Sequence, residues 1–165
     1  MRILVILILP FILIKGLSAQ EKLKNILPVK DGKVTYTNIV KVDSVSKSEL
    51  YKRAKRWIAY TSYSVKLDID DELVGIGNIQ YYNKTDFWQI PFTIKIQFKD
   101  CRYKYEISDF AVMEFAERDN PSAFKKYSID SQRYKKEFYE SIDTSVNNII
   151  ESLEKVMKTT VDNNW

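Results

Sequence analysis

Histidine is absent from this chain of 165 residues, and cysteine occurs once, at Cys101. Without imidazole, a catalytic triad of the Ser–His–Asp type is excluded, and so are zinc sites built from Cys and His. A single cysteine also excludes a disulfide within the chain. The fold must therefore gain its stability from packing, and aromatic residues, at 13% of the sequence, suit that task.

A long apolar run is present only at the start of the chain. Residues 3–14 are almost entirely apolar, Arg2 precedes them, and small or polar residues follow up to Ala19. This is the layout of a secretory signal peptide, and a membrane span would need roughly 20 apolar residues. We expect residues 1–19 to be a signal peptide, cleaved after Ala19 or after Ser18; a retained membrane anchor is the weaker alternative. We also expect an exported protein, periplasmic or secreted, and no lipoprotein anchor because no cysteine ends the run.

The chain that remains after cleavage carries little net charge. The formal net charge of +4 falls to +2, since Arg2 and Lys15 lie in the removed segment. A charge this small predicts no strong electrostatic partner, and the length suits one domain. We expect a leader over residues 20–33, ending in a turn, and a single domain over residues 34–160.

The first elements of the domain are a strand and a capped helix. Residues 34–42 are rich in β-branched side chains, and their alternation slips at Asn38–Ile39, where we expect a bulge. Ser46 followed by Glu49 is a capping box, which predicts the start of a helix. Apolar residues then recur at helical spacing: Leu50, Tyr51, Ala54, Trp57, Ile58 and Thr61. The opposite side, interpreted as a solvated face, carries Lys47, Lys52, Arg53, Lys55 and Arg56.

Antiparallel strands are expected in the middle of the chain. Apolar and polar residues alternate over 90–98 and again over 103–107, on either side of a tight turn at 99–102, and this pattern predicts a hairpin. Residues 73–82 form a further expected strand, and a shorter one can form at 65–69. The glycines at 75 and 77 indicate a bulge or a close backbone approach.

The last part of the chain is expected to be an irregular connection followed by a helix. Residues 110–130 show no sustained period. From Ser131, apolar residues recur at three and four positions as Tyr134, Phe138, Ile142, Val146, Ile149, Ile150, Leu153, Val156 and Met157. We expect this helix to pack on the sheet rather than to form a coiled coil.

This order of elements predicts an α+β fold in which two helices cover one face of an antiparallel sheet. The predicted inward residues of the sheet are Ile90, Phe92, Ile94, Ile96, Phe98, Tyr103, Tyr105 and Ile107. They are expected to meet Trp57, Ile58, Ile142 and Val146 of the helices.

The stretch from Val34 to Phe110 resembles a known family. It carries, in order, Val42-Asp43-Ser44-Val45-Ser46-Lys47-Ser48-Glu49-Leu50-Tyr51, then Ala54-Lys55-Arg56-Trp57, then Gly75-Ile76-Gly77, and finally Asp100-Cys101-Arg102-Tyr103. These motifs are similar to those of an uncharacterised Bacteroidota domain described as having a TATA-binding-protein-like fold. The resemblance implies a curved antiparallel sheet with helices on one side, in exported proteins of Gram-negative bacteria. It implies no established activity, cofactor or catalytic residue.

One position departs from that family, which usually has glycine where Cys101 stands. A type I′ hairpin turn requires a positive φ there, which cysteine adopts with strain, so a different turn type is expected.

Nucleic-acid binding is not expected, in spite of the fold name. Proteins that bend DNA with a sheet insert apolar wedges into the minor groove. The face opposite the core instead carries Thr93, Lys95, Gln97, Lys99, Arg102, Lys104 and Glu106. Export would also separate the protein from the DNA of the cell.

No catalytic, cofactor or metal site is predicted. Cys101 lacks a histidine to activate it as a nucleophile, and we interpret it as a turn residue. The acidic residues Asp68, Asp70, Asp71 and Glu72 lack EF-hand spacing and indicate a charged turn between strands. Acids such as Asp109 and Glu114 can serve glycoside chemistry, but nothing in the sequence fixes their separation.

The basic row formed by Lys95, Lys99, Arg102 and Lys104 is the candidate binding surface. Such lysines can instead serve only to discourage edge pairing. The leading hypothesis is a non-catalytic cell-envelope protein that binds a protein or an anionic glycan or lipid headgroup through this row. The alternatives are a periplasmic hydrolase that uses carboxylates only and a structural protein that self-associates through residues 134–157.

Overall fold

The computed structural model describes residues 26–69, 71–83, 86–115, 124–131 and 134–159. The predicted signal peptide, residues 1–19, lies outside these ranges. The elements are, in chain order, β1 (Val29–Lys30), β2 (Lys33–Val34), β3 (Tyr36–Lys41), α2 (Lys47–Thr61), β4 (Ser64–Ile69), β5 (Glu72–Asn83), β6 (Asp86–Lys99), β7 (Arg102–Ser108), β8 (Ala111–Phe115), β9 (Phe124–Ser128), the 3₁₀ turn η1 (Ile129–Ser131) and α3 (Lys136–Lys158).

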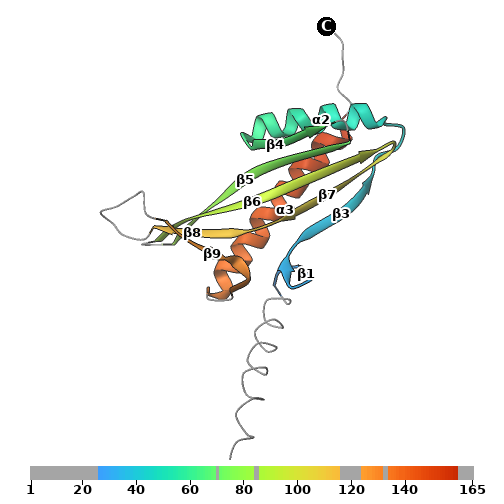
Figure 1. Ribbon diagram of the computed structural model, residues 1–165. Coiled ribbons are helices and arrows are strands. Elements are labelled where there is room, and N and C mark those ends of the chain that lie inside the picture. Colours follow the sequence, from blue (N-terminus) through green and yellow to red (C-terminus); the bar gives the residue numbers. More distant parts are fainter. Residues whose placement is uncertain (1–25, 70, 84–85, 116–123, 132–133, 160–165) are drawn as a thin grey trace, which may run out of the picture.

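The main sheet is antiparallel, with the strand order β3-β7-β6-β5-β4. The long strand β6 extends beyond β7, and β8 pairs with that extension while β9 pairs with β8. Both α2 and α3 cover the same face of the sheet (Figure 1). The predicted α+β fold, with its helices on one side, is therefore confirmed.

The core lies between this face and the two helices. Every sheet residue predicted to point inward is at most 6% exposed, and so are the four helix residues predicted to meet them. The alternation of apolar and polar residues in β6 and β7 therefore predicted correctly which side chains face the helices. The opposite face of the sheet, called here the open face, is covered by neither of the two described helices (Figure 1).

The expected bulge in the first strand is wrong. β3 pairs with β7 in unbroken register from Tyr36 to Lys41. The alternation of apolar and polar residues is broken at Asn38. This residue is on the core side of the strand, between the buried Tyr36 and Val40, but it is exposed to water at the edge of the sheet. Ile39 in turn points to the open face and is 60% exposed.

The expectation of an irregular segment over residues 110–130 is also wrong, because β8, β9 and η1 occupy the described part of it. Asp109 adopts a φ of 56°, which turns the chain between β7 and β8. β8 then fills the edge of β6 that the shorter β7 leaves open and buries Ala111 and Val112. Five-residue strands are too short to give a clear period in the sequence.

The helix α2 begins as its capping signal predicted, because the Ser46 hydroxyl oxygen accepts a hydrogen bond from the Glu49 backbone N–H. Its basic face is not wholly solvated, however, since Arg53 is only 5% exposed. The Arg53 guanidinium forms an ion pair with Glu49 at 2.9 Å and donates to the Met157 carbonyl oxygen at 2.7 Å. A cation is favourable there because carbonyl groups at a helix C-terminus carry partial negative charge. Arg53 thereby holds the end of α3 against α2.

The apolar stripe of α3 is used within the domain. Its residues Phe138, Tyr139, Ile142, Val146, Leu153 and Met157 are all buried. Trp57 of α2 donates its indole N–H to the Ser152 hydroxyl oxygen of α3 at 3.0 Å, which fixes the two helices together. Neither helix, within the described residues, combines the length and apolarity that crossing a membrane requires.

The packed part of the chain begins before Val34. Leu27, in the predicted leader, is 1% exposed and belongs to the core. The expected turn at Asp31–Gly32 joins β1 to β2, and both of its residues have positive φ. The Val34 backbone N–H also donates to a carboxylate oxygen of Asp130, so this hairpin is tied to η1.

The two glycines of β5 face the core, where neighbouring side chains lie close to the backbone of the strand. A Cβ atom at Gly77 would lie 2.3 Å from the Phe92 ring, whereas one at Gly75 would lie 3.4 Å from the Ile58 terminal methyl group. The pairing of β5 with β6 shows no bulge at either position, but β4 has a register shift between Val65 and Leu67, where it passes Gly75. Gly77 is therefore the position of close approach, and Gly75 lies opposite an irregularity in the neighbouring strand.

Candidate binding pocket on the open sheet face

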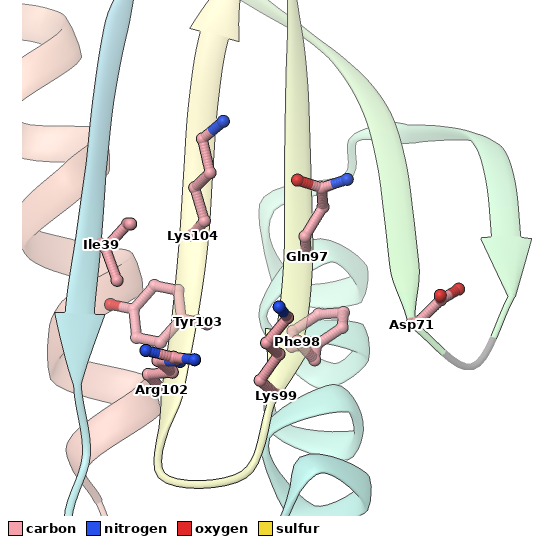
Figure 2. Close-up of a pocket in the computed structure, with 8 residues that line it drawn as sticks. All are labelled: Ile39, Asp71, Gln97, Phe98, Lys99, Arg102, Tyr103 and Lys104. Carbon is pink, nitrogen blue, oxygen red and sulfur yellow. The ribbon is translucent and has the colours of Figure 1, made fainter.

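A pocket of about 420 Å³ lies on the open face, at the end of the β6–β7 hairpin. It is lined by Ile39, Asp71, Gln97, Phe98, Lys99, Arg102, Tyr103 and Lys104. The side chains of Lys99, Arg102 and Lys104 stand on the same side of the hairpin, away from the helices (Figure 2). Three of the four predicted binding residues therefore meet at one place.

The strand register explains this convergence. Lys99 and Arg102 are direct cross-strand partners at the end of the hairpin, and Lys104 pairs with Gln97 one row further on. Cross-strand partners project from the same face of a sheet, with their Cβ atoms about 5 Å apart. Lys95 lies on the same face but does not line the pocket, and its ammonium group forms an ion pair with Glu72 at 3.3 Å.

The pocket has an excess of positive charge, with three cationic side chains against the carboxylate of Asp71. Among the described residues, no ion pair holds Lys99 or Arg102, while Lys104 lies 4.0 Å from Glu106. Two exposed cations held side by side repel each other weakly, and a bound anion removes that repulsion. Arg102 adds a planar guanidinium group suited to carboxylate and phosphate.

The turn that presents Lys99 and Arg102 is fastened to the rest of the domain. The Asp100 carboxylate accepts from the Lys47 backbone N–H at 2.8 Å, at the start of α2. The Cys101 backbone N–H donates to the Val45 carbonyl oxygen, and the Cys101 carbonyl oxygen accepts from the Val42 N–H, both at 2.9 Å. The two cations that flank the turn are thus carried on a rigid support.

Cys101 itself is a turn residue with an exposed side chain and does not line the pocket. Its φ is 58°, whereas Asp100 is not among the residues of positive φ. A type I′ turn requires positive φ at both central positions. The turn is therefore of another type, as expected for a chain that has cysteine here.

Sequence reasoning missed the less polar half of the pocket. Ile39, from β3, reaches the pocket beside Lys104, its cross-strand partner. The sequence did carry a sign of this contribution, because Ile39 is an apolar residue outside the alternating pattern, but we interpreted it as part of a bulge. Phe98 and Tyr103 line the pocket although their rings belong to the buried core, and burial raises the pKa of the Tyr103 phenol. The pocket therefore joins a cationic rim to apolar surface.

Two of the predicted acidic residues, Asp68 and Glu72, form ion pairs, and Asp70 lies outside the described residues. The Asp68 carboxylate contacts the Lys55 ammonium group at 2.8 Å and also accepts from the Tyr51 hydroxyl. These hydrogen bonds, that of Lys55 first, hold the pKa of Asp68 below its ordinary value. A catalytic acid needs the opposite shift. Within the described ranges, no group of three or more acidic or cysteine side chains is placed to hold a metal ion.

A carboxylate-only hydrolase requires two acids that face each other across a cleft. Among the described residues, one acid lines the pocket, Asp71. The Glu114 carboxylate, considered with Asp109 in the sequence, instead accepts a hydrogen bond from the Tyr134 hydroxyl at 3.0 Å. The pocket therefore does not supply the pair of acids that this alternative needs.

Comparison with known proteins places the core of the chain in a family. Residues 36–113 match the family described as "Domain of unknown function (DUF4468) with TBP-like fold". Residues 36–113 are a DUF4468 domain. This match confirms the resemblance noted in the sequence. It identifies no catalytic family.

Two solved structures share the fold of this chain. A TBP-like protein from Parabacteroides distasonis has a TM-score of 0.67 at 19% identity, over 81% of this chain and 98% of that one. A DUF4468 family protein from Bacteroides ovatus has a TM-score of 0.64 at 11% identity, over 83% of this chain and 93% of that one. The likeness in fold extends beyond the residues that match the family. No curated protein matches the chain.

Proposed function

We propose that this DUF4468 protein is a non-catalytic, exported binding protein of the cell envelope, and that its pocket takes an anionic group. Carboxylate and phosphate are the chemical classes that fit, whether carried by a glycan, a lipid headgroup or a protein. The observation that carries the proposal is the convergence of Lys99, Arg102 and Lys104 on one pocket of the open face. Export rests on the predicted signal peptide.

The form of the pocket favours a ligand that is anionic at one end and less polar at the other. Lys99 and Arg102 occupy the hairpin end, and the exposed Ile39 supplies apolar contact next to Lys104. Because the pocket is an open surface, a chain or a headgroup can reach it without any movement of the protein. Preorganised cations also reduce the entropy cost of binding.

The test compares two triple variants that remove the same charge. K99Q/R102Q/K104Q changes the pocket, and K52Q/R56Q/K155Q changes exposed residues of the helices on the other side of the sheet. The probes are a polyuronate and anionic-phospholipid vesicles, each with a neutral counterpart, at two salt concentrations. Since hydrogen bonds to charged groups contribute about 1.5–3 kcal/mol each, the pocket variant should bind at least about tenfold more weakly.

The control variant should bind as the unchanged chain does, apart from a small general loss of attraction that salt screens. Preference for the polyuronate or for the vesicles identifies the source of the anionic group. Equal binding by the two triple variants would show that the pocket is not the site. An unchanged chain that bound neither anionic probe, and captured the same proteins from an envelope extract as the pocket variant, would exclude the proposed function.

A further inference from the structure

The edge strand β4 is exposed along its whole length. Its residues Ser64 to Ile69 are all exposed, and β4 pairs only with β5 among the described strands. Val65 is 49% exposed, Leu67 38% and Ile69 49%, so this edge is apolar as well as unpaired. An apolar strand with a free row of backbone N–H and C=O groups is a template for pairing with another strand.

The opposite edge of the sheet, β3, is less suited to such pairing. The Asn38 side-chain oxygen accepts from the Ile39 backbone N–H at 2.8 Å, so this backbone donor is already used. Lys41 is the only charged residue of β3, and no acid of the strand can pair with it. Within the described part of β4, by contrast, no side chain caps the backbone N–H groups of the strand.

The sequence of β4 is complementary to itself when two copies run antiparallel. It reads Ser64-Val65-Lys66-Leu67-Asp68-Ile69. A twofold axis at Leu67 places Lys66 of each copy opposite Asp68 of the other, and it places Leu67 opposite its own counterpart. Opposite charges and apolar pairs at directly opposed positions each stabilise an antiparallel ladder. Both rules are thus met from Lys66 to Asp68. The complementary contact ends there, because Val65 pairs with the core-facing Gly75 whereas Ile69 pairs with Glu72, so the side chains of Val65 and Ile69 lie on opposite faces of the sheet.

We propose that a second copy of this chain pairs with β4 in this register, so that the two sheets form one continuous sheet in a twofold dimer. A twofold contact uses the same surface on both copies, which is what this strand provides. The proposal is independent of the pocket, which no residue of β4 lines. It also differs from self-association through α3, whose apolar stripe is buried.

Two features indicate that the pairing is short and readily reversible. The register of β4 against β5 shifts between Val65 and Leu67, and a shift of this kind bends a strand. Asp68 already contacts Lys55 of α2, so a partner's Lys66 would share its carboxylate. The expected dimer therefore forms in a concentration-dependent way.

The test measures the mass of residues 20–165, which include every described residue, by sedimentation over a range of protein concentrations. The variant K66D sets two carboxylates opposite each other at both ends of the contact and should raise the dissociation constant at least about tenfold. K52D makes the same charge change on an exposed position of α2 and should leave the constant unchanged.

Mixing variants tests the register itself. In D68K, two lysines face each other in a dimer of identical chains, but K66D and D68K are complementary at both pairs when mixed. A heterodimer from two chains that are monomeric alone is therefore expected, with the fold of D68K checked by its melting curve. A monomer at every concentration, or equal dimerisation by K66D and K52D, would overturn the proposal.

Discussion

The close approach of β5 to β6 at Gly77 makes Gly77→Ala the sharpest test of the packing described above. The added Cβ atom would lie 2.3 Å from Cζ of Phe92 and under 3.0 Å from two further ring atoms. The ring cannot easily move aside, because Tyr63 packs on it edge-on at 5.6 Å and Phe110 contacts it at 5.9 Å. Phe92 itself is 1% exposed.

The magnitude follows from two opposing effects. Extra atoms in a well-packed core cost about 1–3 kcal/mol. Replacing glycine also lowers the conformational entropy of the unfolded chain, and this stabilises the folded state by about 0.4–1 kcal/mol. Gly77→Ala should therefore lower the free energy of unfolding by about 1–2 kcal/mol. Gly75→Ala is the matched control, since its Cβ atom would lie 3.4 Å from a methyl group of Ile58, 3.5 Å from one of Ile94 and 3.7 Å from Cβ of Tyr63, which are ordinary van der Waals distances. It should be neutral or stabilising by up to about 1 kcal/mol.

Urea unfolding of the two variants and of the unchanged chain, followed by tryptophan fluorescence, measures both values. In a thermal melt, each kcal/mol corresponds to a shift of about 2–4 °C for a chain of this size. Equal stability of the two alanine variants would refute the argument, because the two positions share one strand and one face and differ only in what the Cβ atom meets.

Three further predictions concern the turn, one hydrogen bond and one ion pair. Cys101→Gly should raise the free energy of unfolding by up to about 1 kcal/mol, since glycine adopts a φ of 58° without strain, and Cys101→Ala should give no such gain in the same urea titration. Tyr36→Phe removes the hydroxyl that donates to Asp143 of α3 at 2.8 Å and should cost about 1 kcal/mol; an unchanged denaturation midpoint would contradict this. Asp68 has a lowered pKa in the folded chain, so its carboxylate stabilises the fold above the pKa of an unfolded Asp, and this contribution is lost as pH falls through the folded pKa. The stability difference between the unchanged chain and Asp68→Asn should therefore be present at pH 7 and disappear in acid, and a difference that grew in acid would have the wrong sign.

The sequence predicted the parts of the fold in which a long period is uninterrupted. The alternation over 90–98 and the helical spacing after Ser46 correspond to β6 and α2, and their buried faces are as expected except for Arg53, which α2 also buries. The strands at 111–115 and 124–128 escaped prediction because each is only five residues long. Their pairing depends on the overhang of β6, which is a property of the assembled sheet.

The candidate site could likewise be predicted only in part. Lys99, Arg102 and Lys104 could be predicted because an alternating hairpin fixes which side chains share a face. Ile39 could not, since its contribution depends on which strand lies next to β7. The burial of Arg53 was also hidden, because the carbonyl group that accepts its hydrogen bond lies more than a hundred residues away in the sequence.

The attachment of the Asp100–Cys101 turn to the start of α2 limits how far the pocket can be reduced to a peptide. A synthetic hairpin covering 90–108 would retain every cation of the pocket, but it would lose the three hydrogen bonds that join the turn to backbone groups of Val42, Val45 and Lys47. Such a fragment would have to order itself when it meets an anion, and the entropy lost in doing so would be subtracted from its affinity. Binding of an anion therefore depends on the folded domain around the hairpin. The isolated hairpin should lose this binding although it keeps all three cations.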